Sequence, residues 1–177
     1  MKLSPETIAK YSNQLGAIVA LSASTLSLLS STVFNLIPCT LCYWQRIFMY
    51  PLAFIYIGAM WRQDAKTYTY SLPLAIGGAG FAAYHYALQM GWIKLAESCV
   101  GSVSCTEIYL QFAGFFTIPL ASLIGFAVVI VLSIIQWRNQ DSPAASNQQS
   151  FTKQLQPVIV ATLAIVLLAS YVLQAVI

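Results

Sequence analysis

The sequence predicts an all-α, polytopic membrane protein, in which a bundle of four transmembrane helices is followed by a fifth, C-terminal transmembrane helix. Of its 177 residues, 59% are apolar and only 7% are charged. A soluble domain carries about 25% charged residues, so this supply cannot cover a water-facing surface. Several apolar runs also approach the roughly 20 residues that a helix needs to cross a bilayer. The formal charge of +3 therefore does not indicate nucleic-acid binding, and no nucleic-acid partner is expected.

Five spans follow from the hydropathy of the chain, and each is expected to be helical because backbone groups in lipid need internal partners. Their approximate bounds are Gln14–Phe34, Tyr43–Met60, Tyr70–Trp92, Gly114–Gln136 and Val158–Val176. Three parts are expected: a four-helix membrane domain over residues 1–137, a polar cytoplasmic linker over 138–157 and an additional transmembrane helix over 158–177. Pro157 suits the first turn of that last helix.

The basic residues predict the orientation of these spans. Most of them fall on one side, which the positive-inside rule makes cytoplasmic together with the N-terminus: Lys2, Lys10, Arg62, Lys66, Arg138 and Lys153. Only Arg46 and Lys94 fall on the other side. All the cysteines then face the extracytoplasmic side, where oxidising conditions permit disulfide chemistry.

The segment Cys39-Thr40-Leu41-Cys42 begins the second span, directly after Pro38. A C-x-x-C pair is typical of a redox dithiol or of a zinc site. The free N–H groups and dipole of the helix N-terminus favour a thiolate, and Arg46, four residues after Cys42, adds a cation on the same face. These features predict a reactive Cys42. The zinc alternative needs Cys99 and Cys105 as partners, whose spacing is wider than that of usual zinc ligands.

Two ionisable residues in the spans have more than one interpretation. Arg46 either extends its side chain to the membrane surface or binds a polar group of an electron acceptor in the bilayer. His85, the only histidine, lies about seven residues inside the outer end of the third span. Such a residue is a functional candidate, although neighbouring helices can also satisfy a buried histidine. Earlier in the same span, small residues predict close helix packing: Gly77, Gly78 and Gly80.

The second cysteine pair, Cys99 and Cys105, lies in the only sizeable outside loop, which runs from Ile93 to about Ala113. Gly and Ser residues between the two cysteines predict local flexibility. The pair is either a static structural disulfide or a mobile pair that exchanges with a soluble thiol protein through mixed disulfides.

At these residues the chain resembles the DsbB family of quinone-coupled, disulfide-forming membrane proteins, and in particular its short-loop branch, called BdbC. The resemblance covers about Gln14 to Gln136. It rests on Cys39-Thr40-Leu41-Cys42 with Gln45-Arg46, on His85-Tyr86-Ala87-Leu88-Gln89, on the loop pair Cys99 and Cys105, and on Gly114-Phe115-Phe116-Thr117-Ile118-Pro119.

The resemblance implies a thiol:quinone oxidoreductase of the bacterial cytoplasmic (inner) membrane that supports protein disulfide bond formation. A reduced thioredoxin-like partner of the DsbA type would attack the loop disulfide at Cys99. Cys105 would pass the electrons to Cys39, and Cys42 would reduce a quinone, ubiquinone or menaquinone. That quinone would lie near Arg46, with His85 as a second contact.

Two features of the chain depart from the family pattern. The cysteine loop is much shorter than in the longest-loop members, and the fifth span lies outside the four-helix pattern. Vitamin K epoxide reductase-like proteins have their loop cysteines before the C-x-x-C, which is the reverse of the order here. Two other classes of function remain: a membrane protein with purely structural disulfides, and a four-thiol metal-binding or metal-transport protein.

Overall fold

The computed structural model describes residues 5–93, 105–106, 111–112, 115–139 and 151–176. In this part of the chain the helices are α1 (Pro5–Thr32), α2 (Thr40–Arg62), α3 (Tyr68–Gln89), α4 (Ile118–Arg138) and α6 (Phe151–Val176). Two short antiparallel strands, β1 (Gln111–Phe112) and β2 (Phe116–Thr117), pair just before α4. The predicted all-α fold class is confirmed.

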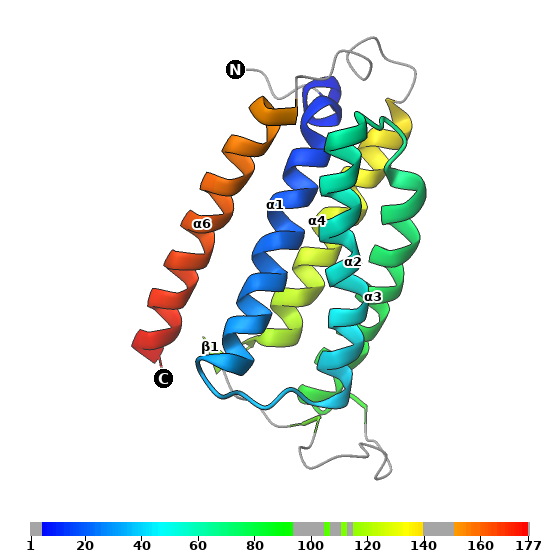
Figure 1. The fold of residues 1–177 in the computed structure, drawn as a ribbon. Helices are drawn as coiled ribbons and strands as arrows, with labels where there is room; N and C mark the ends of the chain where they lie inside the picture. The colour runs from blue at the N-terminus through cyan, green and yellow to red at the C-terminus, as the bar shows by residue number, and fades with distance from the viewer. Residues whose placement is uncertain (1–4, 94–104, 107–110, 113–114, 140–150, 177) are drawn as a thin grey trace.

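The first four helices form a bundle in which α1 packs on α2, α2 on α3, α3 on α4 and α4 on α1. Helix α6 lies outside this bundle, mainly against α1 (Figure 1). The N-terminal end of α2, the C-terminal end of α3 and the C-terminal end of α6 lie at the same end of the molecule, opposite the start of α1. The candidate site and the start of α1 therefore lie at opposite ends of the bundle.

Three of the helices are long and apolar enough to cross a membrane: Thr7–Thr32, Ile118–Arg138 and Lys153–Val172. Helices α2 and α3 have comparable lengths, 23 and 22 residues, and pack against each other within the same bundle. They are rich in aromatic residues, and α2 carries Arg46 while α3 carries His85. Cys42, Arg46 and His85 thus lie on these two helices of the bundle.

The bundle core lies between large side chains of α2 and α4 and small residues of α1 and α3. Tyr56 and Phe126 are among the largest fully buried side chains. Gly78 lies directly against the Phe126 ring and Gly77 against Phe48, as expected for close helix packing. The same expectation was wrong for Gly80, because a Cβ atom added there would meet no other atom within 4 Å. The helical face that carries Gly80 has no close neighbour.

A polar cluster closes the end of the bundle opposite the cysteines. The Asn13 side-chain amide donates to the Asp64 carbonyl oxygen at 2.9 Å, and Gln136 donates to Asn13 Oδ1 at 3.1 Å. The Tyr68 backbone N–H donates to Gln136 Oε1 at 3.1 Å. Leaving such a buried group unpaired costs about 1–3 kcal/mol, so this cluster fixes α1, α4 and the α2–α3 connection relative to one another.

Three predicted boundaries differ from the structure by four residues or more. Helix α1 begins at Pro5, nine residues before the predicted Gln14. Helix α4 begins at Ile118 rather than Gly114, because β2 precedes it and Pro119 suits its first turn. Helix α6 begins at Phe151, so the linker expected over 138–157 is shorter and Pro157 lies inside the helix instead of in its first turn. The reason is packing: Gln154 and Val158 are buried, which stabilises the first two turns.

We expect Gly78→Ala to destabilise the folded protein, because the added methyl group overlaps the Phe126 ring in a packed core. Overpacking of this kind costs about 1–3 kcal/mol. Gly80→Ala, two residues along the same helix, is the matched control and should be neutral or stabilising, because alanine favours helix more than glycine does. Thermal unfolding in detergent measures both, and an unchanged melting temperature for Gly78→Ala would contradict the packing argument.

Candidate active site

The two membrane cysteines occupy different positions at the start of α2. Cys39 is the N-cap residue, with extended backbone at φ −73° and ψ 170°, and its sulfur accepts the Cys42 backbone N–H at 3.4 Å. Cys42 lies inside the first turn. An N-cap side chain turns back toward the free N–H groups of that turn, so the helix geometry brings the two sulfurs to 3.1 Å. Both cysteines are free, and little movement separates them from a disulfide.

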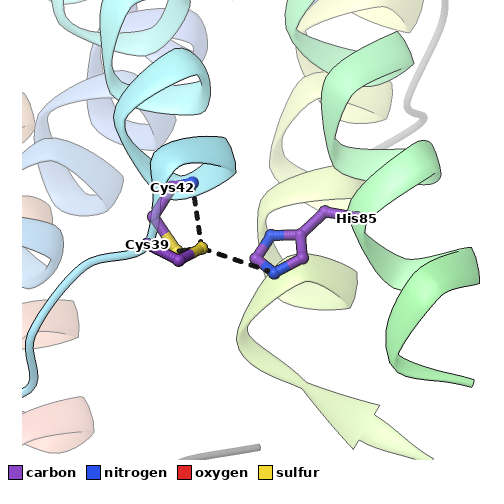
Figure 2. Close-up of side chains that lie close together, drawn as sticks. All are labelled: Cys39, Cys42 and His85. Carbon is purple, nitrogen blue, oxygen red and sulfur yellow. Dashed lines mark hydrogen bonds between the residues drawn. The ribbon is translucent and has the colours of Figure 1, made fainter. Parts of the chain in front are cut away.

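His85 of α3 connects the cysteine pair to the rest of the site (Figure 2). Its ring is only 2% exposed. Nε2 lies 3.7 Å from Cys39 Sγ and 3.2 Å from the Cys105 carbonyl oxygen, while Nδ1 lies 3.0 Å from the Gln45 amide nitrogen. Because an amide nitrogen only donates, Nδ1 accepts and the proton of the neutral ring is on Nε2. His85 therefore directs an N–H group at both Cys39 and Cys105.

This arrangement lowers the pKa of the Cys39 thiol from its ordinary value of 9.0 to about 4. The hydrogen bond with Cys42 lowers it most, burial opposes this effect, and the hydrogen bond from His85 lowers the pKa further. The sequence predicted that the helix N-terminus would act on Cys42. In the structure the Cys42 backbone N–H is directed at the sulfur of the N-cap residue, Cys39, so this part of the helix N-terminus acts on Cys39.

Arg46 is held against α1. Its Nη2 donates to the Ser27 carbonyl oxygen at 2.8 Å and to Ser31 Oγ at 3.3 Å, and the guanidinium carbon lies 5.7 Å from the centre of the Tyr43 ring. Among the described hydrogen bonds, none joins Arg46 to Cys42, although the two residues line the same cavity. The guanidinium group is therefore hydrogen-bonded to α1 and borders the cavity.

A cavity of about 650 Å³ opens beside Cys42 and Arg46, between α1, α2, α4 and α6. This volume lies within the range of small-molecule sites, about 300–1,000 Å³. Most of its walls are apolar, but several lining residues carry a buried polar atom without a hydrogen-bond partner among the described residues: Ser22 Oγ, Arg46 Nε, Tyr50 Oη and Thr117 Oγ1. Cys39 and His85 do not belong to the lining. His85, expected as a second contact of the quinone, lies instead with Cys39.

Of the loop pair, Cys105 belongs to the described residues and Cys99 lies outside them. Cys105 is disulfide-bonded, and its residue is only 1% exposed. Its carbonyl oxygen accepts the hydrogen bond from His85, as described above. The turn that contains Cys105 is therefore packed on His85.

Cys39, Cys42 and His85 also form a group whose ligand atoms all lie within 4.8 Å of one another. Thiolate and imidazole are ligands that zinc prefers, but a structural zinc site usually has four of them. Within the described part of the chain this group has three members. The geometry suits thiol chemistry without a metal and leaves the metal alternative to be tested.

Sequence reasoning assigned no role to Gln45, Tyr50 or Thr117. Gln45 is a buried amide one turn after Cys42. A polar side chain in an apolar helix, so close to a C-x-x-C pair, could have indicated that Gln45 belongs to the site. Tyr50 follows Arg46 by four residues, so it lies on the same helical face. Thr117 had no local signal, because the β1–β2 pairing brings it to the cavity.

Comparison with known proteins identifies the family. Residues 10–136 match the family model described as disulfide bond formation protein DsbB. The chain is 39% identical over 131 residues to a probable disulfide formation protein C 2 of Bacillus cereus, covering 74% of this chain and 94% of the relative. It is 40% identical over 115 residues to the disulfide bond formation protein C of Bacillus subtilis, covering 64% and 83%. No solved structure matches the chain. The chain belongs to the DsbB family.

In the reduced protein, we expect Cys39 to react with iodoacetamide as a thiolate at neutral pH, with a rate that falls only as the pH drops through about 4. A lowered pKa keeps the thiolate above that pH, and protonation below it removes the nucleophile. His85→Ala should raise the midpoint by about one unit or more, whereas His85→Gln keeps an N–H donor and should raise it less. Peptide mass spectrometry of Cys39 gives the rates, and a wild-type midpoint near 9 would contradict the assignment.

Proposed function

We propose that this DsbB-family chain is a thiol:quinone oxidoreductase that re-oxidises an extracytoplasmic, thioredoxin-like partner of the DsbA type. Family membership gives the chain a role in disulfide bond formation. One observation carries the finer assignment: Cys42 lines an apolar cavity together with Arg46, while Cys39 contacts His85 beside the disulfide-bonded Cys105. The membrane pair thus lies between a second disulfide and a space of the size of a small-molecule site.

The proposed relay consists of balanced thiol–disulfide exchanges. A thiolate of the partner attacks Cys99, which breaks the Cys99–Cys105 bond and releases Cys105 as a thiolate. Cys105 attacks Cys39 of an oxidised membrane pair, and Cys42 leaves as a thiolate. The partner's second thiol releases the oxidised partner from Cys99, and Cys99 then displaces Cys39 from Cys105. The loop disulfide is restored, and two electrons remain on Cys39 and Cys42.

His85 has a defined role in this sequence. In the last exchange Cys39 is the leaving group, and a leaving thiol with a low pKa departs faster. The N–H group at His85 Nε2 stabilises the thiolate that forms at Cys39 Sγ. Gln45 holds the ring in the tautomer that this requires. His85 is therefore proposed to act on the thiol exchange, at Cys39.

The residues around the cavity fit a quinone. When bound, a quinone would accept the two electrons and two protons that return the membrane pair to a disulfide. Arg46 would hold a quinone oxygen, and the Nε atom of its guanidinium is buried without a partner among the described residues. The Tyr50 and Thr117 hydroxyls are further donors without a partner in the same lining. Cys42 supplies the sulfur at the end of this cavity.

The relay requires the cysteine end of the bundle to face the extracytoplasmic side. The basic residues at the opposite end, including Arg62 and Arg138 in the last turns of α2 and α4, support this orientation. Because α6 ends at the same end of the molecule as the start of α2, the C-terminus should then be extracytoplasmic too. Reporter fusions at the C-terminus check this, and cytoplasmic activity of the reporter would refute the proposed topology.

A second candidate function, thiol-based metal binding, has one specific observation in its favour, the close group of Cys39, Cys42 and His85. Zinc analysis of freshly purified protein separates the two functions. Stoichiometric zinc that is lost in Cys39→Ser would favour the metal site, whereas the oxidoreductase is expected to contain no stoichiometric zinc. Purely structural disulfides have less support, because Cys39 and Cys42 are both free.

With a reduced thioredoxin-like donor and a quinone, we expect Cys42→Ser to abolish quinone reduction, because its sulfur delivers the electrons. Arg46→Gln should raise the apparent KM for quinone by about tenfold, as expected when one charged hydrogen bond is lost, with an unchanged KM for the donor. Arg62→Gln, at the far end of α2, is the matched control. Absorbance of the quinone follows both reactions. Full activity of Cys42→Ser would refute the proposal, and equal losses for both substrates in Arg46→Gln would make Arg46 structural.

A further inference from the structure

Helix α6 lies outside residues 10–136, the part that matches the family, yet it is firmly attached to the bundle. Its contacts are mainly with α1, and its buried residues repeat along one face: Gln154, Val158 and Val166. The intervals of four and eight residues correspond to about one and two helical turns. One face of α6 thus docks on α1, while most of its other residues are exposed, including Leu167, Leu168 and Tyr171.

The same face of α6 reaches the cavity beside the cysteines in the second half of the helix. Ile165, Ala169 and Val172 belong to its lining. Their spacing of four and three residues puts them on one side of the helix. In Figure 1, α6 runs along α1 and ends at the level where α2 begins. Part of the cavity wall therefore comes from a helix that lies outside the region matching the family.

The cavity is elongated and has two chemically different ends. On α1 its lining extends from Ile18 to Ser30, which corresponds to about 18 Å of helix. Cys42 and Arg46 lie at the end near the start of α2, whereas Ile18, Val19 and Phe126 lie deeper in the bundle. A quinone has the same division, with a polar ring and an apolar isoprenoid tail. The ring fits beside Cys42, and the tail fits the deeper part next to Ile165.

We propose that α6 forms the wall that holds the isoprenoid tail, so that this helix sets the affinity of the protein for long-tailed quinones. The inference rests on the proposed function, because it assigns the occupant of the same cavity. Moving a tail from lipid into this cavity removes no apolar surface from water, since lipid is itself apolar. The wall therefore acts through van der Waals packing, and the size and shape of its side chains decide the affinity.

The residue that tests this best is Ala169, the smallest of the α6 residues in the lining. In the full chain, Ala169→Trp fills the cavity at the tail, and Ala164→Trp introduces the same side chain at an exposed position of α6 outside the lining. Quinone reduction is measured with two quinones that share one ring, one with a single isoprene unit and one with several. Quinone that co-purifies with each variant is extracted and quantified.

We expect Ala169→Trp to raise the apparent KM for the long-tailed quinone by about tenfold or more, as a misfit in a specific pocket does. The KM for the short-tailed quinone should change less and the KM for the thiol donor should not change. Less quinone should co-purify with this variant than with wild type, and Ala164→Trp should match wild type in every measurement.

Failure of this inference differs from failure of the proposed function. If the wild-type protein does not reduce quinone, both the proposed function and this inference are refuted. If wild type is active and Ala169→Trp keeps its KM for the long-tailed quinone, only the role of α6 is overturned. If Ala169→Trp does not fold, the double variant Ile165→Ala, Val172→Ala removes the wall instead. It should raise the ratio of long-tail to short-tail KM, and an unchanged ratio would also overturn the inference.

Discussion

The buried ring of His85 is the constraint on which the cysteine site depends. A histidine inside a helical membrane bundle needs partners for both ring nitrogens, because neither water nor lipid supplies them there. Here the partners come from α2 and from the turn at Cys105. Satisfying one ring therefore fixes α3 against the N-terminus of α2 and brings Cys105 close to the first cysteine pair. The close approach of α3 to its neighbours, permitted at Gly77 and Gly78, makes that meeting possible.

Two cysteines three residues apart have become chemically distinct. Cys39 is an N-cap, with one backbone N–H and one imidazole N–H directed at its sulfur, and its pKa is low. Cys42 is inside the helix and lines the cavity with Arg46. Such a difference suits a relay, because a pair that takes electrons on one side and delivers them on the other needs two unlike sulfurs. It arises from one helix boundary, since a helix starting earlier would place both sulfurs inside it.

The two ends of the bundle use polar groups for different purposes. At the end near Asn13, buried amides satisfy one another and fix the helices. At the cysteine end, several buried polar atoms lack partners among the described residues, and four of the side chains that carry them line one cavity. Unpaired buried groups are costly, so their concentration around one cavity favours a ligand there over a purely structural role. Helix α6 contributes part of the wall of this cavity.

The sequence by itself determined the helical membrane class, the family resemblance and the cysteines expected to carry the thiol chemistry. It could do so because composition and a C-x-x-C pair are local properties. It also predicted five helices, with errors at the starts of α1, α4 and α6. At α4 and α6, the strand β2 and the docking of Gln154 outweigh local preference. Which cysteine is the N-cap, what His85 contacts and where Thr117 lies depend on packing between segments distant in sequence. Only the tertiary structure decided that His85 lies next to Cys39 and that α6 borders the cavity. These contacts join helices far apart in the chain, and no local sequence pattern indicates which helices will pack together.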